Sequence, residues 1–198
     1  FAHRLKLRRR EVESGTQALL FGQATHLALE TTFARPRLPP TRGDWPPVLV
    51  DAFDEALRKL APNLDPTSAS SILLRERFRP LADQVPTIES ALDETFGPRT
   101  PIAFEVPFSC TVGGIAVRGK IDRADRLAND SLLLIDYKTG SVDFSPDHVA
   151  RGENFQALLY VEAAPLTLNA PCAGIVFYDL RRGEARRGLV NDTAIRPE

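Results

Sequence analysis

Apolar residues recur three or four positions apart through the first part of the chain, which is the spacing of one face of a helix. This pattern predicts a helix over Thr16 to Phe33 and a second helix over Val48 to Leu60. The segment between them, Arg35 to Pro47, is rich in proline. Because proline cannot continue a helix, this segment is predicted to be a connector.

Prolines also divide the next helical segment. One or two further helices are predicted over Ser70 to Glu94, interrupted near Pro80 and Pro86, since each proline removes a backbone donor from the helix. Helical spacing ends at Gly97-Pro98. The first half of the chain is therefore predicted to be a helical region that precedes a sheet.

Shorter apolar runs follow, separated by turn residues, and predict three antiparallel strands. The strands are Ile102 to Cys110, Ile115 to Leu127 and Leu132 to Lys138. Turns are predicted at Val112-Gly113-Gly114 and at Asn129-Asp130-Ser131, where glycine and asparagine favour a reversal of the chain.

The last part of the chain returns to a helix and then to a strand. A helix is predicted from about Asn154 to Ala164, stopped by Pro165. A last strand, Ala173 to Asp179, leads into a hairpin around Arg182-Gly183. This order of elements predicts an α/β (α+β) domain, with a small mixed β-sheet flanked by helices and an N-terminal helical region.

The composition fits a globular domain, with 43% hydrophobic and 26% charged residues among 198. No apolar run approaches the roughly 20 residues needed to cross a bilayer, so no membrane partner is expected. The N-terminus is charged and shows no signal peptide, which favours the cytoplasm. The chain contains no methionine and opens on Phe1, so it is expected to be a piece of a longer polypeptide.

Two acids and a lysine carry the strongest chemical signal. Asp136 and Lys138 are two apart on a strand and point to the same face, and a hairpin between the strands brings Asp122 beside Asp136. Two carboxylates and an ammonium hold a divalent metal and steady an attacking water, as phosphodiester hydrolysis requires. Alternatively, these are solvated acids at strand ends. Asp136 follows four large apolar residues, where an unpaired carboxylate is costly, and this favours the site.

Three further polar residues lie on predicted helices. His26 is either a histidine at the edge of the core or, since imidazole suits Mn²⁺ or Mg²⁺ beside carboxylates, a third metal ligand. Gln156 and Tyr160 are four apart and share one helix face. They form either a plain polar stripe or a pair that binds phosphate and positions the lysine.

Together these residues form an ordered set of motifs. The set runs from Gly-x-x-x-His through Gly-Lys-Ile-Asp-Arg and Ile-Asp-Tyr-Lys-Thr-Gly to Gln-x-x-x-Tyr. It resembles the RecB-type branch of the PD-(D/E)XK nuclease superfamily, and most closely the C-terminal nuclease domain of the AddB subunit of bacterial AddAB helicase-nucleases. The resemblance covers His26 to about Asp179. It implies a restriction-endonuclease-like core and a metal-dependent deoxyribonuclease.

The resemblance also implies a role for each residue. His26, Asp122 and Asp136 would ligate Mg²⁺ or Mn²⁺ together with the backbone carbonyl of Tyr137. Lys138 would orient or activate the water. The residues implied to be catalytic are Asp122, Asp136, Lys138, Gln156 and Tyr160, and those implied to contact DNA are Arg123, Arg151, Gln156 and Tyr160. Glu105 falls where many relatives have an acid and receives a supporting role at most.

The same resemblance implies the organisation and the partners. Residues 1–198 would form a single nuclease domain, with residues 35–96 as a helical insertion between the helix that bears His26 and the catalytic sheet. The partners would be DNA, a helicase-nuclease subunit and other domains of the parent chain, in the bacterial cytoplasm. Many relatives carry four cysteines that hold an iron–sulfur cluster. Cys110 and Cys172 are too few to build one, so no such cluster is expected from them.

The formal net charge of −1 bears on how the chain holds DNA. A protein that grips nucleic acid unaided usually shows a basic excess, so local contacts are expected instead, from Arg118, Arg123, Arg151 and Arg181. Three functions stay open. The first is a nuclease domain of a recombination-repair complex, acting as an exonuclease; the others are a stand-alone RecB-like exonuclease and a non-catalytic DNA-binding scaffold of the same fold.

Overall fold

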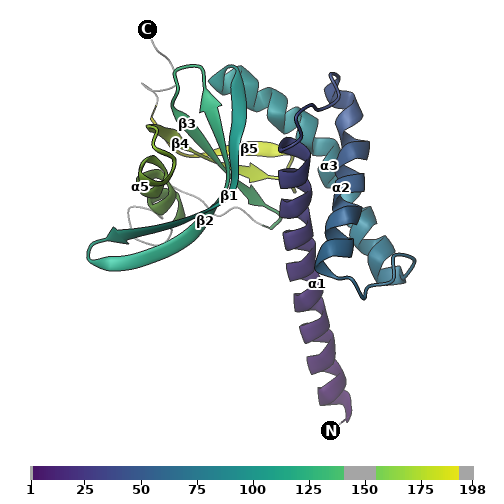
Figure 1. The fold of residues 1–198 in the computed structure, drawn as a ribbon. Helices are drawn as coiled ribbons and strands as arrows, with labels where there is room; N and C mark the ends of the chain where they lie inside the picture. Colours follow the sequence, from purple (N-terminus) through teal and green to yellow (C-terminus); the bar gives the residue numbers. More distant parts are fainter. Residues whose placement is uncertain (1, 141–154, 192–198) are drawn as a thin grey trace. The chain divides into compact units, whose positions relative to one another are not determined.

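The computed structural model describes residues 2–140 and 155–191 (Figure 1). The chain divides into two compact units, Phe1–Ala82 and Asp83–Glu198, and each is considered by itself. Among the described residues, no helix is both long and apolar enough to cross a membrane.

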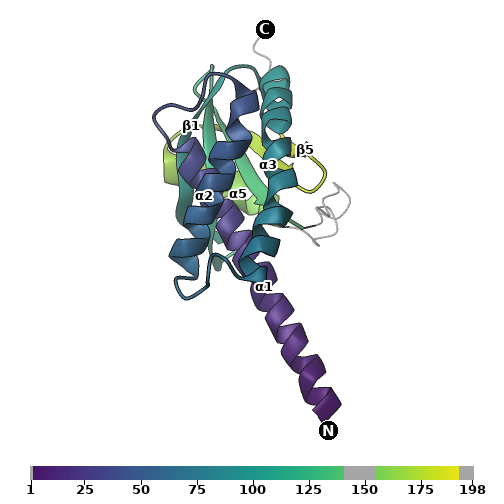
Figure 2. The same cartoon turned by 90° about the vertical axis from the view of Figure 1, so that its right-hand side faces the viewer.

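The first unit is helical. It contains α1 (Ala2–Phe33), a 3₁₀ turn (Arg42–Asp44), α2 (Trp45–Leu60) and the first half of α3 (Ala69–Phe96). Figure 2 shows α1 and α2 running side by side. Three aromatic rings, one from each helix, meet in the core. The ring of Phe53 stacks on that of Phe78 with centroids 4.2 Å apart and lies edge-on to Phe21 at 5.8 Å.

Both predicted helices of this unit are present, but each begins earlier than predicted, α1 at Ala2 instead of Thr16 and α2 at Trp45 instead of Val48. The helix α2 begins at Trp45, so Pro46 and Pro47 lie in its first turn and not in the connector. Proline is tolerated there because the first backbone N–H groups of a helix have no partner within the helix.

The predicted interruption near Pro80 and Pro86 is wrong, because α3 runs without a break from Ala69 to Phe96. One row of its apolar residues falls at helical spacing and is buried, namely Leu74, Phe78, Ala82, Val85, Ile88 and Leu92. Packing of this continuous apolar face outweighs the cost of the two missing backbone hydrogen bonds.

The second unit is built on a five-stranded sheet with the order β1-β2-β3-β4-β5. The strands are β1 (Arg99–Val112), β2 (Ile115–Leu127), β3 (Leu132–Lys138), β4 (Cys172–Asp179) and β5 (Glu184–Val190). Among the strand pairs that the structure describes, only β3–β4 is parallel. The predicted bounds of β2 and β3 are confirmed. The three predicted chain reversals connect the antiparallel pairs β1–β2, β2–β3 and β4–β5. The prediction of a mixed sheet flanked by helices, consistent with a restriction-endonuclease-like core, is therefore confirmed.

Helix α5 (Gln156–Leu168) lies between β3 and β4 in the sequence and covers one face of the sheet (Figure 1). Its residues Ala157, Ala163 and Ala164 pack in one cluster with Leu134 and Phe177. The helix continues through Pro165 and ends where Asn169 takes a left-handed conformation, so the predicted stop at Pro165 is wrong. The predicted start at Asn154 lies outside the described residues.

The second half of α3 contacts the same sheet through polar groups. The hydroxyl of Tyr178, on β4, donates a hydrogen bond of 3.2 Å to the carbonyl of Val85. Glu89, one helical turn further on, forms ion pairs with Arg99 and Arg123 on β1 and β2. The residues at the end of β3 are thus held within a sheet that is fixed by helix contacts.

Candidate functional site

The end of β3 presents the first part of the candidate site. Its residues Leu132 to Ile135 are fully buried, because β3 is paired on both edges, with β2 and with β4. Asp136 follows them and is only 2% exposed, whereas the side chain of Lys138 is 29% exposed. The two side chains meet, with Lys138 Nζ 2.6 Å from Asp136 Oδ2. A buried carboxylate next to an ammonium that reaches solvent is the arrangement that the spacing predicts.

A glutamine from α5 joins these two charged groups. Gln156 Nε2 donates to Asp136 Oδ1 at 2.7 Å, and Lys138 Nζ donates to Gln156 Oε1 at 3.0 Å. The amide therefore offers its donor to the carboxylate and its acceptor to the ammonium. Gln156 Nε2 also lies 3.0 Å from the hydroxyl oxygen of Tyr160. Four predicted site residues, Asp136, Lys138, Gln156 and Tyr160, thus form one hydrogen-bonded group, which we call the Gln156 network.

Tyr160 remains a neutral phenol in this surrounding. Burial raises the pKa of Tyr160 to about 12, and the nearby negative charges of Asp136, Asp122 and Glu105 act in the same direction. The ring of Tyr160 lies edge-on to Phe108 with centroids 5.5 Å apart. The phenol is therefore held in place by packing and keeps its proton at any pH in the physiological range.

Asp122 lies where β2 leaves β3. The pairing of the two strands ends at Arg123 and Ile135, and Asp122 is the next residue along β2. Its Oδ2 accepts a hydrogen bond of 2.9 Å from the backbone N–H of Tyr137, so the side chain takes the place of a strand-to-strand hydrogen bond. Asp122 is thereby held beside the residue that separates Asp136 from Lys138.

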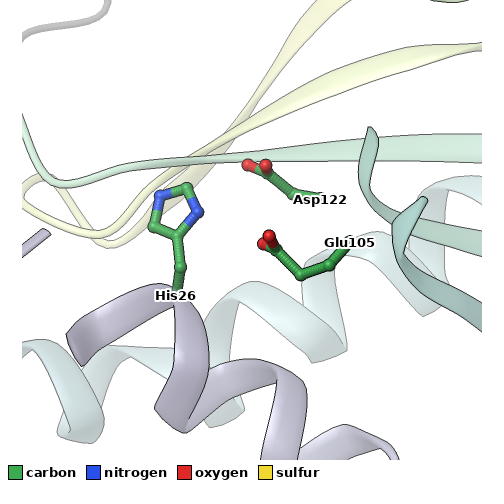
Figure 3. A group of neighbouring side chains, drawn as sticks. All are labelled: His26, Glu105 and Asp122. Atoms are coloured by element: carbon green, nitrogen blue, oxygen red, sulfur yellow. The ribbon is translucent and has the colours of Figure 1, made fainter. Parts of the chain in front are cut away.

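Glu105 accompanies Asp122 on the neighbouring strand. It falls between the paired positions Phe104–Arg123 and Val106–Ile121, directly opposite Asp122. One carboxylate oxygen of each lies within 4.8 Å of the other (Figure 3). Glu105 has a φ of 49°, a left-handed conformation that is strained for a side chain of this kind and is found at functional sites. The sequence suggested only a supporting role for Glu105, since nothing local signals this backbone conformation.

His26 comes from α1, in the first unit, whereas Glu105 and Asp122 come from β1 and β2 (Figure 3). The side chain of His26 is half-buried. Its role as a metal ligand stays a prediction. Arg151, predicted to contact DNA, lies outside the described residues.

Arg123 occupies a different environment from the one predicted. It is 1% exposed and donates to Asp125 at 2.6 and 2.7 Å and to Glu89 at 2.8 and 3.3 Å. Arg99 pairs with the same two carboxylates. A guanidinium that is enclosed by two buried carboxylates offers nothing to a phosphate, so the structure does not support a DNA contact by Arg123. We call Glu89, Arg99, Arg123 and Asp125 the buried ionic cluster.

Tyr137 connects the buried ionic cluster to the candidate site. Its backbone N–H holds Asp122, and its side chain lies edge-on to Tyr178 with centroids 5.4 Å apart. Burial raises the pKa of the Tyr137 hydroxyl, although the charge of Arg123 acts against this rise. Successive residues of a strand point to opposite faces. Asp136 and Lys138 therefore lie with Gln156 on one face of the sheet, while the side chain of Tyr137 lies on the other face with the buried ionic cluster.

The group of oxygen donors fits a hard divalent cation. Carboxylate and carbonyl oxygens are the ligands preferred by Mg²⁺ and Mn²⁺. The Glu105 and Asp122 oxygens, within 4.8 Å of each other, are close enough to share one ion after a small movement of either side chain. Each carboxylate also has about four lone-pair positions, so those of Asp122 and Asp136 can accept more than the hydrogen bonds described.

Comparison with known proteins agrees with these features. The family model of the PD-(D/E)XK nuclease superfamily matches residues 1–195. No curated protein matches the chain.

Proposed function

The chain belongs to the PD-(D/E)XK nuclease superfamily, whose members are generally metal-dependent nucleases, and we propose that it cleaves DNA at a site built from Asp122, Asp136 and Lys138. The observation that carries this proposal is the Gln156 network. It holds an ammonium against a buried carboxylate, at 2.6 Å, next to a second acid. An ordinary solvated Asp-x-Lys pair would need no amide between its two charges.

We propose that Asp122 and Asp136 hold Mg²⁺ or Mn²⁺ with His26 and the backbone carbonyl of Tyr137, and that Glu105 supports Asp122. When bound, such an ion lowers the pKa of a water molecule and offsets negative charge on a phosphate. The fit rests on the donor set, because the oxygens of acids and carbonyls together with one imidazole match these cations.

The residues of the chain itself prepare the reaction. Asp136 and Gln156 fix the Lys138 ammonium in one orientation, at 2.6 and 3.0 Å, so that its charge stands ready for the negative charge that develops on the phosphate. Gln156 is hydrogen-bonded to both groups and so fixes the position of the Asp136 carboxylate relative to the Lys138 ammonium. Tyr160 stays protonated and contributes a neutral hydroxyl on the side of the site that faces DNA.

We further propose that the chain acts as an exonuclease in recombination repair, as the nuclease domain of an AddB-like polypeptide with a helicase-nuclease partner subunit, in the bacterial cytoplasm. Its support is the order of the four motifs from His26 to Tyr160. We also propose that residues 1–198 act as a single nuclease domain, with residues 35–96 as the helical insertion.

Incubation with linear and circular DNA, in Mg²⁺, in Mn²⁺ or in EDTA, tests the proposal. We expect degradation of linear DNA with metal, sparing of circular DNA, and no cleavage in EDTA. Lys138→Ala should abolish cleavage, whereas Lys59→Ala, which removes the same charge from an exposed position of α2, should not. Full cleavage in excess EDTA would refute the metal-dependent site, and DNA binding without cleavage in any metal would indicate a scaffold instead.

A further inference from the structure

The β1–β2 hairpin continues past the sheet to which it belongs. Among the described residues, β2 pairs with β3 from Arg123 to Arg126, whereas the earlier part of β2 pairs with β1 as far as the Val112–Ile115 pair. Figure 1 shows this two-stranded part of the hairpin extending away from β3 and β4. We call residues 106–121 the hairpin arm.

The two faces of the hairpin arm differ. The inner face carries Phe108 and Ile121, which pack with α5 in one apolar cluster. The residues of the outer face are all exposed, and these are Pro107, Ser109, Thr111, Ala116, Arg118 and Lys120. The arm contains two cations, Arg118 and Lys120, and no acid. In a chain with a net charge of −1, this is a local excess of positive charge on one face.

This outer face is continuous with the candidate site. Lys120 forms an ion pair with Glu105, and Glu105 lies within 4.8 Å of Asp122. Arg118 lies two residues before Lys120 on β2 and points to the same side, further from Asp122. At about 3.4 Å per residue, Arg118 lies no more than about 14 Å along the strand from Asp122.

The inner face fixes the arm relative to the Gln156 network. The ring of Phe108 contacts Tyr160 edge-on, at 5.5 Å between centroids. Gly119 makes room for this ring, because a Cβ at position 119 would lie 2.5 Å from Phe108 Cζ. The arm is therefore packed against the helix that carries Gln156 and holds its outer face at a set distance from the site.

We propose that the outer face of the hairpin arm binds the phosphates of the DNA strand next to the bond that is cleaved. The inference rests on the proposed nuclease function and adds to it the surface that holds the substrate. Cations and hydroxyls are the side chains that contact DNA phosphates, and a two-stranded ribbon fits against a DNA groove. Since duplex DNA advances 3.4 Å per nucleotide, Arg118 contacts a phosphate within about four nucleotides of the scissile one.

Arg118→Ala tests this proposal, with Arg126→Ala as its matched control. Both arginines lie on β2, four residues to either side of Asp122, and both are at least partly exposed. Arg126 lies outside the hairpin arm and pairs with Asp130 at 3.5 Å, so the control differs in position and not in distance along the strand. Binding of the full chain to a labelled linear DNA is measured by fluorescence anisotropy in EDTA, over a series of salt concentrations. We expect Arg118→Ala to bind about three to ten times more weakly, and its salt slope to fall by about 0.7–0.9, the share of one phosphate contact.

The control and the rescue decide between a local contact and a general effect of charge. Arg126→Ala should keep the affinity and the salt slope of the unmodified chain, and Arg118→Lys should restore most of both. Equal losses in Arg118→Ala and Arg126→Ala, or no loss in Arg118→Ala, would overturn the role of the arm while metal-dependent cleavage still supports the nuclease. A chain that neither binds nor cleaves DNA would overturn both proposals.

Discussion

Replacement of Arg123 by methionine should lower the free energy of unfolding by about 3–5 kcal/mol. Methionine keeps most of the length and the apolar stem of arginine but removes the guanidinium. Glu89 and Asp125 would then share the charge of Arg99 alone, in a region where the Glu89 and Asp125 side chains are 4% and 0% exposed. The loss is large because a buried carboxylate that loses its partner cannot recover its hydration.

The magnitude can be judged against the rest of the protein. A typical domain is stable by about 5–15 kcal/mol, so the expected loss is a large part of the total. Arg126→Met removes an arginine from the same strand, but its partner Asp130 is 85% exposed. An exposed ion pair contributes about 0–1 kcal/mol, so this control should unfold close to the unmodified chain.

Urea unfolding followed by far-ultraviolet circular dichroism measures the difference. Fluorescence of Trp45 is less suitable, because this residue lies in the first unit and Arg123 in the second. A loss below about 1 kcal/mol, which is the size of an exposed pair, would refute the view that the buried ionic cluster depends on Arg123.

The pH dependence gives an independent check. Burial alone raises the pKa of Glu89, but the charges of Arg123 and Arg99 outweigh it and the pKa is lowered. In the unmodified chain Glu89 therefore contributes stability above its unfolded pKa, and this is lost as the pH falls through the folded pKa. Without Arg123, burial should raise the pKa of Glu89 in the folded state above its value in the unfolded chain. The deficit of Arg123→Met should then shrink between pH 7 and about 4.5, where folded Glu89 takes up a proton. A constant deficit would contradict this assignment.

Three further outcomes follow from the site. Gly119→Ala should lower stability by about 1–3 kcal/mol in urea unfolding, because its Cβ would overlap the ring of Phe108, whereas Gly43→Ala, with 3.8 Å to its nearest neighbour, should lose nothing. Tyr160→Phe should leave the shape of the pH profile of cleavage unchanged below pH 10, because the pKa of this phenol is raised to about 12; a lost basic limb would contradict this. Mn²⁺ should raise the melting temperature of the unmodified chain but not that of Asp136→Asn, and an equal rise in both would exclude Asp136 as a ligand.

The strands that carry the acids could be read directly from the sequence. The bounds of β2 and β3 were predicted correctly because the signals are local: four buried apolar residues before Asp136, and turn residues on both sides of each strand. The side-chain period of a strand then places Asp136 and Lys138 on one face without any further knowledge. The contact between Gln156 and Tyr160 follows in the same way from the period of a helix.

The errors arose where distant parts of the chain override a local rule. Pro80, Pro86 and Pro165 each predict a break, yet both helices continue. The apolar face of α3 is buried on both sides of its two prolines, and Leu168, which follows Pro165, packs against the cluster that contains Ala163 and Ala164. Within β2, the sequence alone does not distinguish the buried Arg123 from an exposed arginine. Its partner Glu89 lies 34 residues earlier in the sequence.

The sequence by itself determined that Asp136 and Lys138 share one face of a strand, and that Gln156 and Tyr160 share one face of a helix, because those relations depend on spacings of two and four residues. That the two pairs meet in the Gln156 network was decided by the tertiary structure, since the contacts of Gln156 with Asp136 and Lys138 join residues 20 and 18 apart. Only the tertiary structure decided the surroundings of Asp122. Glu105 lies opposite Asp122 because of the pairing of β1 with β2 and its own backbone φ of 49°. Arg123 is buried because the second half of α3 packs against the sheet and supplies its partner Glu89. Burial and charge pairing are properties of the assembled fold, since they arise from groups that meet only when the chain has folded.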